Sequence, residues 1–300
     1  MAGWYRDVFG FLPAGGTRFR GPAIEALQGL AGASSRTRWL VEQQEFFQLE
    51  MFQFDEPAPR PFARDRTPID IGYTTIGIHV ADFDAVLERL DSAGTTSIAG
   101  NGAPGHRRVA VRDPEGVLIE IMEDDPWPVA LPNRARPYVP GSVRFVRASV
   151  PNLRLATHFF ASVLGLEPLF EPHLHRASHE SLWSEFGADA DSVELAAGDC
   201  ILELVHHRMP QGRGWPEGYR ISDQGLLNIA FGGRSRREYE AVKDRVRASG
   251  YPMHAEMRTD FASVVYVEDG QGFSVELLYL EPGSESLAGF EPRSWDRPGK

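Results

Sequence analysis

The sequence predicts an α+β protein made of four similar units, each running strand, helix, strand, strand, strand. One observation is a repeat, because VRDPEGVLIEI at 111–121 recurs as VEDGQGFSVEL at 267–277. Both copies have Asp, then Gly three residues on and Glu seven residues on, which predicts a hairpin turn followed by a strand. The other observation is a glutamate in the last strand of every unit. These are Glu50, Glu120, Glu203 and Glu276, which are 70 residues apart in the first half and 73 in the second.

The first unit opens on a helix, because positions 4, 5, 8, 9 and 11 are apolar at helical spacing and Gly10 can cap its end. The opening strand of this unit is therefore missing. A Gly- and Ala-rich stretch at 21–32 gives at most a short helix, and 38–54 extends into a strand that carries Glu50. The second unit has a strand at 69–80, a helix at 81–93 capped by Asp82, and strands near 95–98, 107–112 and 117–122.

A proline-rich stretch at 126–141 separates the two halves and predicts a linker. The third unit has a strand at 143–150, a helix at 153–164, and strands at 169–175, 192–196 and 200–206. The fourth has a strand through LLNIAF, a helix at 235–249, and strands at 253–257, 263–267 and 273–280. We expect a first domain at 1–125, a second at 142–281 and a polar tail at 282–300. Each domain would pair its own two units.

Composition narrows the class of protein. The chain has 300 residues and a formal net charge of −11, which argues against nucleic acid as a partner. No apolar run is long enough for a membrane span, and the first residues lack the features of a signal peptide, so we expect a cytoplasmic protein. The single cysteine, Cys200, excludes an intramolecular disulfide and a thiolate metal cluster. Any metal site would use nitrogen and oxygen ligands.

Several motifs resemble the vicinal oxygen chelate superfamily, which includes glyoxalase I, methylmalonyl-CoA epimerase, extradiol dioxygenases and bleomycin-resistance proteins. The helices WYRDVFGF and THFFASVLGL, the hairpin RDPEGVLIEI and the strand GLLNIAF carry the resemblance, which extends from Trp4 to about Glu281. It implies that units pair into domains with cupped sheets. Each cup can hold one divalent metal, with His from first strands and Glu from last strands.

Carried over by position, the resemblance keeps all four glutamates but puts Thr75, Phe145 and Asn228 where the family has His. The first cup would then combine Glu50 and Glu120 with Thr75. Two carboxylates and a hydroxyl can bind a divalent ion such as Mg, Mn, Fe or Zn weakly, or bind none and act as an acid/base pair.

We therefore expect Glu50 and Glu120 to be catalytic or to bind metal, with Glu276 as a weaker metal ligand. Tyr73, Thr75, Phe145 and Asn228 would contact a small-molecule substrate. The plain alternative is that the glutamates face solvent in an open cup.

Three functions stay open. The first, which the resemblance favours, is an isomerase or lyase that acts on a small oxygenated organic molecule. The second is a metal-free binding protein of the bleomycin-resistance type. The third is a ring-cleaving dioxygenase with a metal site displaced to the third unit. The residues for this site would be His173, His175, His179, His206, His207 and Glu203. A homodimer that completes the first unit is also consistent with the sequence.

Overall fold

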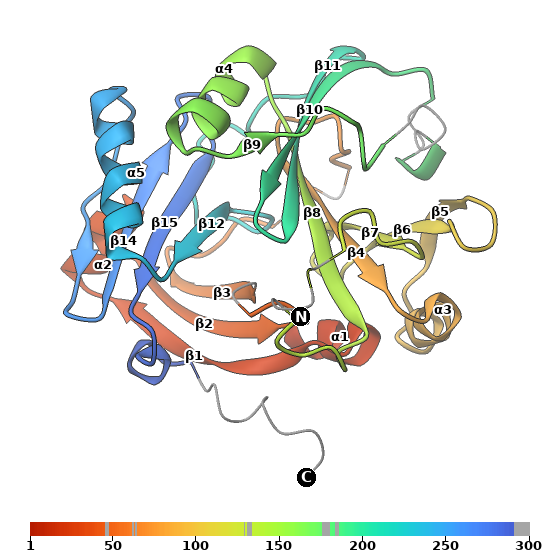
Figure 1. Cartoon of the computed structure of the whole chain (residues 1–300), viewed down its shortest axis with the longest axis horizontal. Coiled ribbons are helices and arrows are strands. Elements are labelled where there is room, and N and C mark those ends of the chain that lie inside the picture. Colours follow the sequence, from red (N-terminus) through yellow and green to blue (C-terminus); the bar gives the residue numbers. More distant parts are fainter. Residues whose placement is uncertain are drawn as a thin grey trace.

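The computed structural model confirms an α+β protein of repeated units (Figure 1). It describes residues 1–45, 48–61, 63, 65–128, 130, 134–175, 181–183 and 186–290. The first unit contains α1 (Ala2–Phe9), β1 (Leu12–Arg20), α2 (Pro22–Gln28), β2 (Ser34–Val41) and β3 (Gln48–Glu56). The second contains β4 (Gly72–Val80), α3 (Phe83–Ser92), β5 (Ser97–Asn101), β6 (Arg108–Arg112) and β7 (Leu118–Met122).

The third and fourth units follow the same order. The third contains β8 (Gly141–Ser149), α4 (Leu153–Thr157) with a π-helical turn (His158–Val163), β9 (Glu167–Pro168), β10 (Asp189–Ala197) and β11 (Cys200–Met209). The fourth contains β12 (Asn228–Gly233), α5 (Arg236–Ala248), β13 (Met257–Arg258), β14 (Ala262–Glu268) and β15 (Ser274–Leu280), and a 3-10 turn (Glu285–Ala288) comes after it.

The repeated hairpins form the predicted turns. The Asp113 carboxylate accepts the backbone N–H of Val117 at 3.0 Å, and Gly116 takes a φ of 98°. The Asp269 carboxylate accepts the backbone N–H of Phe273, also at 3.0 Å. Because Asp satisfies the turn backbone and Gly accepts the positive φ, each motif fixes the start of the strand that follows. β7 and β15 therefore present their glutamates at equivalent positions.

Three sequence predictions for strands were wrong. The strand expected at 253–257 is reduced to β13, which begins only at Met257. The single strand at 38–54 is two antiparallel strands, β2 and β3, and the turn between them is held to the second half of the chain: the Gln44 side chain donates to the Val143 carbonyl at 2.9 Å. The strand predicted at 169–175 does not form, and β9 ends before it at Pro168. The Glu194 carboxylate instead accepts the backbone N–H groups of His173 and Leu174, which ties that backbone down outside a sheet.

The sheets join units in an order that the sequence did not predict. An eight-stranded sheet has the order β5-β6-β7-β4-β8-β11-β10-β9, so the second and third units share it through the antiparallel pair β4 and β8. The first unit forms a three-stranded sheet, β1-β2-β3, and the fourth forms a four-stranded sheet, β12-β15-β14-β13.

The first and fourth units contact each other directly. The His254 ring lies 2.9 Å from the Leu27 carbonyl, and the rings of Trp39 and Phe290 lie 4.3 Å apart. The expected pairing within each half is therefore wrong at the level of the sheets. The boundaries 1–125, 126–141 and 142–281 stay a prediction.

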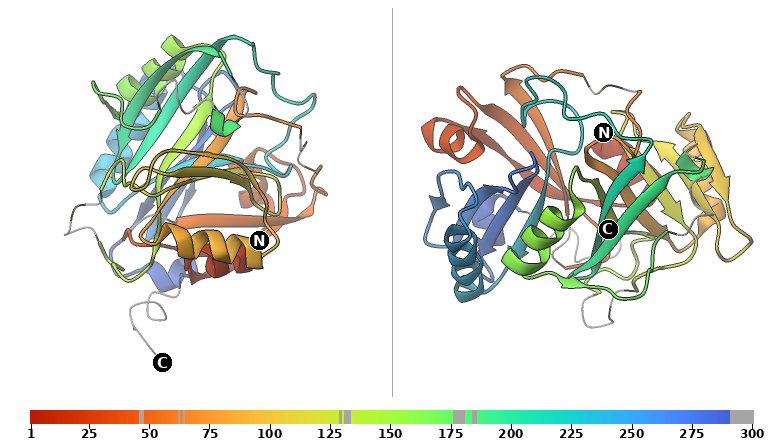
Figure 2. Two further views of the ribbon diagram at one scale, coloured as in Figure 1. Left: turned by 90° about the vertical axis from the view of Figure 1, so that its right-hand side faces the viewer. Right: turned by 90° about the horizontal axis from the view of Figure 1, so that it is seen from above.

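Helices cover the outer faces of the sheets. α1 and α3 lie side by side (Figure 2), and their apolar faces share one core cluster that includes Phe9 and Val86. α4 and α5 belong to a second cluster with Phe159 and Val246. This arrangement leaves the opposite faces of the sheets to form the cups that carry the glutamates.

Gly77 is required by close packing inside the shared sheet. A Cβ atom added to Gly77 would lie 1.9 Å from Cε1 of the Phe145 ring. Because Phe145 is fully buried, Gly77→Ala is expected to destabilise the protein by about 1–3 kcal/mol, measured by urea unfolding. Gly214, around which there is open space, is the matched control, and Gly214→Ala is expected to change the stability little. Equal stability of the two variants would contradict this packing.

Candidate functional site

The four glutamates form two pairs that differ from the predicted one. Glu120 and Glu203 both contact the His175 ring, whereas the charge of Glu276 raises the pKa of Glu50. The predicted pairing of Glu50 with Glu120 is thus wrong. The reason is topological, because the second unit shares its sheet with the third and the first unit lies against the fourth. We call these sites the central cup, around Glu120 and Glu203, and the outer cup, around Glu50 and Glu276.

The central cup is a buried network of charges. The Nε2 atom of His175 lies 3.1 Å from Glu120, and its Nδ1 atom lies 2.7 Å from Glu203. Arg108 donates to the Glu120 carboxylate at 2.8 Å, and an Nη1 atom of Arg147 lies 3.7 Å from Glu203. Both glutamates and both arginines are buried. The imidazole therefore bridges two carboxylates that arginines flank.

The pKa values in the central cup follow from this geometry. Burial alone would raise the pKa of Glu120. The positive charges of His175 and Arg108, together with their hydrogen bonds to the carboxylate, lower this pKa to about 2 instead. Burial would lower the pKa of His175, but the charges of Glu203 and Glu120 raise it above its usual value. The protonated form of His175 and the ionised forms of the two carboxylates therefore stabilise one another.

The remaining space of the central cup is filled. The ring of Phe145 lies 5.3 Å from that of His175, and Trp183 lies 4.8 Å from it on another side. Thr75 is fully buried on β4, opposite Arg147 in the β4 and β8 pair. Thr75 and Phe145, both expected to contact substrate, thus lie away from the cavity described next.

The outer cup holds its glutamates between aromatic hydrogen-bond donors. Glu50 lies opposite Trp39 in the β2 and β3 pair, and the Trp39 indole donates a hydrogen bond to it. Glu276 lies opposite Tyr266 in the β14 and β15 pair and accepts from the Tyr266 hydroxyl. Asn228 donates to the same hydroxyl oxygen. Each carboxylate is thereby oriented by a side chain on the neighbouring strand.

The two outer carboxylates have raised pKa values. Burial and then the charge of Glu276 raise the pKa of Glu50 well above its usual range. Burial raises the pKa of Glu276 to about 7, although the Tyr266 hydrogen bond opposes this shift. Because two neighbouring carboxylates repel when both are ionised, the pair takes up a proton at a higher pH than an ordinary glutamate does.

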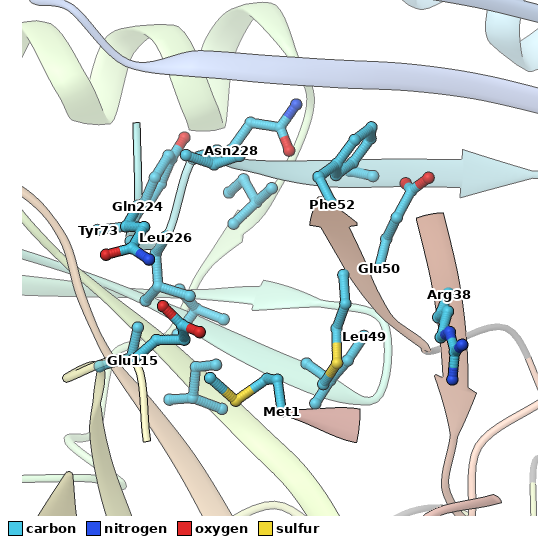
Figure 3. A pocket seen from close by; sticks show the side chains of 18 of the residues that line it. Met1, Arg38, Leu49, Glu50, Phe52, Tyr73, Glu115, Gln224, Leu226 and Asn228 are labelled. Atoms are coloured by element: carbon cyan, nitrogen blue, oxygen red, sulfur yellow. The ribbon is translucent and has the colours of Figure 1, made fainter. Parts of the chain in front are cut away.

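A cavity of about 930 Å³ lies beside the outer cup (Figure 3). Glu50 of β3 and Asn228 of β12 both line it, as does Tyr73 of β4. Phe52, Phe54 and Leu226 give it an apolar wall. Tyr73 and Asn228, both expected to contact substrate, therefore do reach the cavity together with Glu50. Glu120 does not line it.

The residues present do not fit the divalent metal that the resemblance implies. Within the described ranges, no group of three or more His, Cys, Asp or Glu side chains is arranged so that it could hold a metal ion. The outer cup offers two carboxylates and an amide, and its carboxylates already accept hydrogen bonds from Trp39 and Tyr266. In the central cup, His175 and two arginines neutralise the carboxylates.

The histidines expected for a displaced metal site do not converge either. The Nδ1 atom of His173 lies 3.4 Å from Glu194, that of His206 lies 3.0 Å from the Val150 carbonyl, and that of His207 lies 3.4 Å from Ser149. Only His175 contacts Glu203 among the described histidines. His179 lies outside the described residues.

Comparison with known proteins gives a family match for the first part of the chain. Residues 1–121 match the sequence model of the Glyoxalase/Bleomycin resistance protein/Dioxygenase superfamily. This region belongs to that superfamily. The resemblance predicted from the motifs is therefore confirmed for residues 1–121, and superfamily members include glyoxalase I. No curated protein matches the chain in sequence.

Solved structures share the fold of nearly the whole chain. A "putative dioxygenase" from Bacillus subtilis is 14% identical with a TM-score of 0.63, over 99% of this chain and 85% of that one. Glyoxalase I from Zea mays is 16% identical with a TM-score of 0.58, over 96% of this chain and 89% of that one. These similarities show the fold alone. In the described residues, no helix has the length and apolar character needed to cross a membrane.

The raised pKa of Glu276 predicts a specific pH dependence of stability. Its folded pKa of about 7 lies above the ordinary value of 4.5, so the folded state binds the proton more tightly and loses stability as the pH rises between these values. Glu276→Gln removes this loss. We expect the wild type to lose on the order of 2 kcal/mol more than the variant between pH 4.5 and 7, measured by urea unfolding. An identical pH dependence in both proteins would contradict the raised pKa.

Proposed function

We propose that the outer cup catalyses proton transfer on a small oxygenated organic molecule, in a reaction of the isomerase or lyase type. The observation that carries this proposal is the position of Glu50, which lines the cavity and whose pKa is raised by burial and by the charge of Glu276. Carboxyl groups with a pKa near neutrality can exchange protons at the operating pH, which is the requirement for general acid/base catalysis.

Glu50 is the proposed catalytic residue, because its side chain is the one of the pair that lines the cavity. In its ionised form it removes a proton from carbon next to a carbonyl group, and it returns that proton to the neighbouring atom of the intermediate. Trp39 holds the Glu50 carboxylate in place through its hydrogen bond. Glu276 acts through Glu50 by setting its protonation, so it is a positioning residue.

The cavity wall suits a small substrate with an apolar part. Phe52, Phe54 and Tyr73 can pack against a carbon skeleton and exclude water, which strengthens the electrostatic effect of Glu50. Proton transfer next to a carbonyl is also the type of reaction expected from the resemblance to glyoxalases and epimerases. The same aromatic wall favours a second candidate function, the binding of a small molecule without reaction.

A proton-exchange assay separates the two functions. The full chain is incubated in D₂O with a panel of small hydroxy- and oxo-compounds, and NMR follows deuterium at carbon next to the carbonyl. We expect protein-dependent exchange that a chelator leaves unchanged. Binding of a panel compound, measured by calorimetry, with no exchange would contradict catalysis and favour the binding function. Exchange that a chelator abolishes and Mg²⁺ or Mn²⁺ restores would contradict the metal-free mechanism.

A further inference from the structure

Arginine side chains gather on one face of the three-stranded sheet β1-β2-β3. Arg18 lies opposite Arg36 in the β1 and β2 pair, and Arg38 lies two residues further along β2. Because alternate residues of a strand point to the same face, these side chains share a face, and Arg20 of β1 lies on it too. Glu50 lies opposite the residue after Arg38, so it points to the other face, which belongs to the outer cup.

Few negative charges compensate these arginines, and all four are exposed. Arg36 forms an ion pair with Asp55 at 2.8 Å. In the part of the chain that the structure describes, Arg18, Arg20 and Arg38 form no hydrogen bond or ion pair. Like charges directly opposite each other weaken an antiparallel pair, so a bound anion would stabilise this face.

Two of the four arginines reach the cavity beside the outer cup. Arg36 and Arg38 both line it, whereas the two arginines of β1 are not among its lining residues. Neighbouring strands lie about 4.8 Å apart, a distance that an extended arginine side chain spans, so both can extend from β2 across β3. The residues opposite them on β3, Gln53 and Met51, line the cavity as well.

The cavity continues around the edge of β3, which is the end strand of its sheet. The consecutive residues 49–54 line it, and neighbouring residues of a strand point to opposite faces. The cavity therefore meets Glu50 on one face and Arg38 on the other, and Figure 3 shows both side chains around it. A ligand that has its reacting carbon at Glu50 can reach Arg38 only with a group that lies several bonds away from that carbon.

The carboxylates of the cavity leave the arginine end positive. Besides Glu50, the acidic residues that line it are Asp113, Glu115 and Asp223. The first and last of these accept hydrogen bonds from Tyr5 and Arg60, at 3.0 and 2.6 Å. Figure 3 places Glu115 on the opposite side of the cavity from Arg38. A negatively charged group therefore fits the cavity at the arginine end.

We propose that Arg36 and Arg38 bind an anionic group, a carboxylate or a phosphate, at the end of the substrate remote from its carbonyl group. Guanidinium groups donate paired hydrogen bonds to both kinds of anion. The apolar side chains of Leu49 and Met51 contact the carbon chain between the two ends. The position of the carbonyl group at Glu50 rests on the proposed function, but the binding of the anionic end is measured without any reaction.

A set of simple ketones tests where the charge binds. In 6-oxoheptanoate and 5-oxohexyl phosphate the charged group lies far from the carbonyl, whereas in the isomer 2-oxoheptanoate it lies next to it. Methyl 6-oxoheptanoate has no charge. Binding to the full chain is measured by calorimetry. We expect at least one of the two remote anions to bind ~10-fold more tightly than the ester and than 2-oxoheptanoate, and the tighter of the two identifies the group.

Single variants assign the binding to the arginines of the cavity. Arg38→Gln is expected to weaken binding of the tighter anion by about 10-fold and to leave binding of the ester unchanged. Arg20→Gln is the matched control, because it removes the same charge from the same face but outside the cavity, and it should keep the wild-type affinity. Added salt should weaken binding to the wild type more than binding to Arg38→Gln.

The outcomes separate this site from the proposed catalysis. Equal affinity of the wild type and Arg38→Gln for both remote anions would overturn the proposal. An equal loss in Arg20→Gln would also overturn it, because the effect would then come from net charge. Equal binding of the two isomeric acids would overturn the remote position of the anion. Binding that depends on Arg38, without deuterium exchange next to the carbonyl, would support the anion site and contradict the catalysis.

Discussion

Replacing Glu50 by glutamine is expected to reduce the rate of substrate proton exchange by ~10²–10⁴-fold, the usual contribution of a general base. Glutamine keeps the size of the side chain and the hydrogen bond from Trp39, but its amide cannot take up a proton. The NMR assay described above measures this rate. Glu88 is an exposed glutamate on α3, and Glu88→Gln is the control that should keep the wild-type rate.

Replacing Glu276 by glutamine should change the pH profile more than the maximal rate. The negative charge of Glu276 raises the pKa of Glu50, so a neutral amide lets Glu50 ionise at lower pH. Because the ionised form of Glu50 is the base, the acid limb of the rate profile should move to lower pH. If the variant has a lower maximal rate but an acid limb at the same pH as the wild type, Glu276 has a purely structural role.

Local features of the fold could be predicted from the sequence. The Asp113 and Asp269 turns and the capping of α3 by Asp82 depend on residues within a few positions of one another, and all three form as expected. β1 was not predicted, because Pro13, Gly15 and Gly16 give it a low strand propensity. It forms as an end strand paired with β2, where such residues are tolerated.

The pairing of units could not be predicted, because it depends on contacts across the linker. The equal spacing of glutamates within each half is consistent with either pairing. The choice is made by β4 and β8, which pair along most of their lengths and place Phe145 against Gly77. This packing uses the absence of a side chain at one position and a large ring at another, more than 60 residues away in the sequence.

The position of His175 was also beyond sequence reasoning. It was expected on a strand, where its neighbours could be counted, but it comes from a segment whose backbone is bound by Glu194. One feature of the sequence could have indicated that Arg147 belongs to the site. It lies two residues after Phe145 and therefore on the same face of β8. The contact between Arg108 and Glu120 could not be inferred, because it depends on the register between β6 and β7.

The two cups use equivalent glutamates for different purposes. The central cup compensates its carboxylates with buried cations and fills its space with Phe145 and Trp183, so it contributes to stability. The outer cup has carboxylates with raised pKa values and an adjoining cavity, so it can take part in chemistry. Removing a carboxylate should therefore act mainly on the stability of the protein in the central cup and mainly on the reaction rate in the outer cup.

Glu120→Gln is expected to destabilise the folded protein by about 3–5 kcal/mol at pH 7, because Arg108 and His175 would stay buried without the charge that compensates them. The pH dependence gives a second check. The folded pKa of Glu120, about 2, lies below the ordinary value of 4.5, so its contribution is present above pH 4.5 and is lost as the pH falls towards 2. The difference between wild type and variant in urea unfolding should shrink accordingly.

A double variant separates the ion pair from general disruption of the core. Glu120→Gln combined with Arg108→Met removes both members of the pair, so less buried charge is left uncompensated than in Glu120→Gln alone. We expect the double variant to be more stable than the sum of the two single changes predicts, by about 1–3 kcal/mol. Additive losses would show that Glu120 and Arg108 do not interact. Since neither residue lines the cavity, proton exchange by the folded fraction should persist in all three variants.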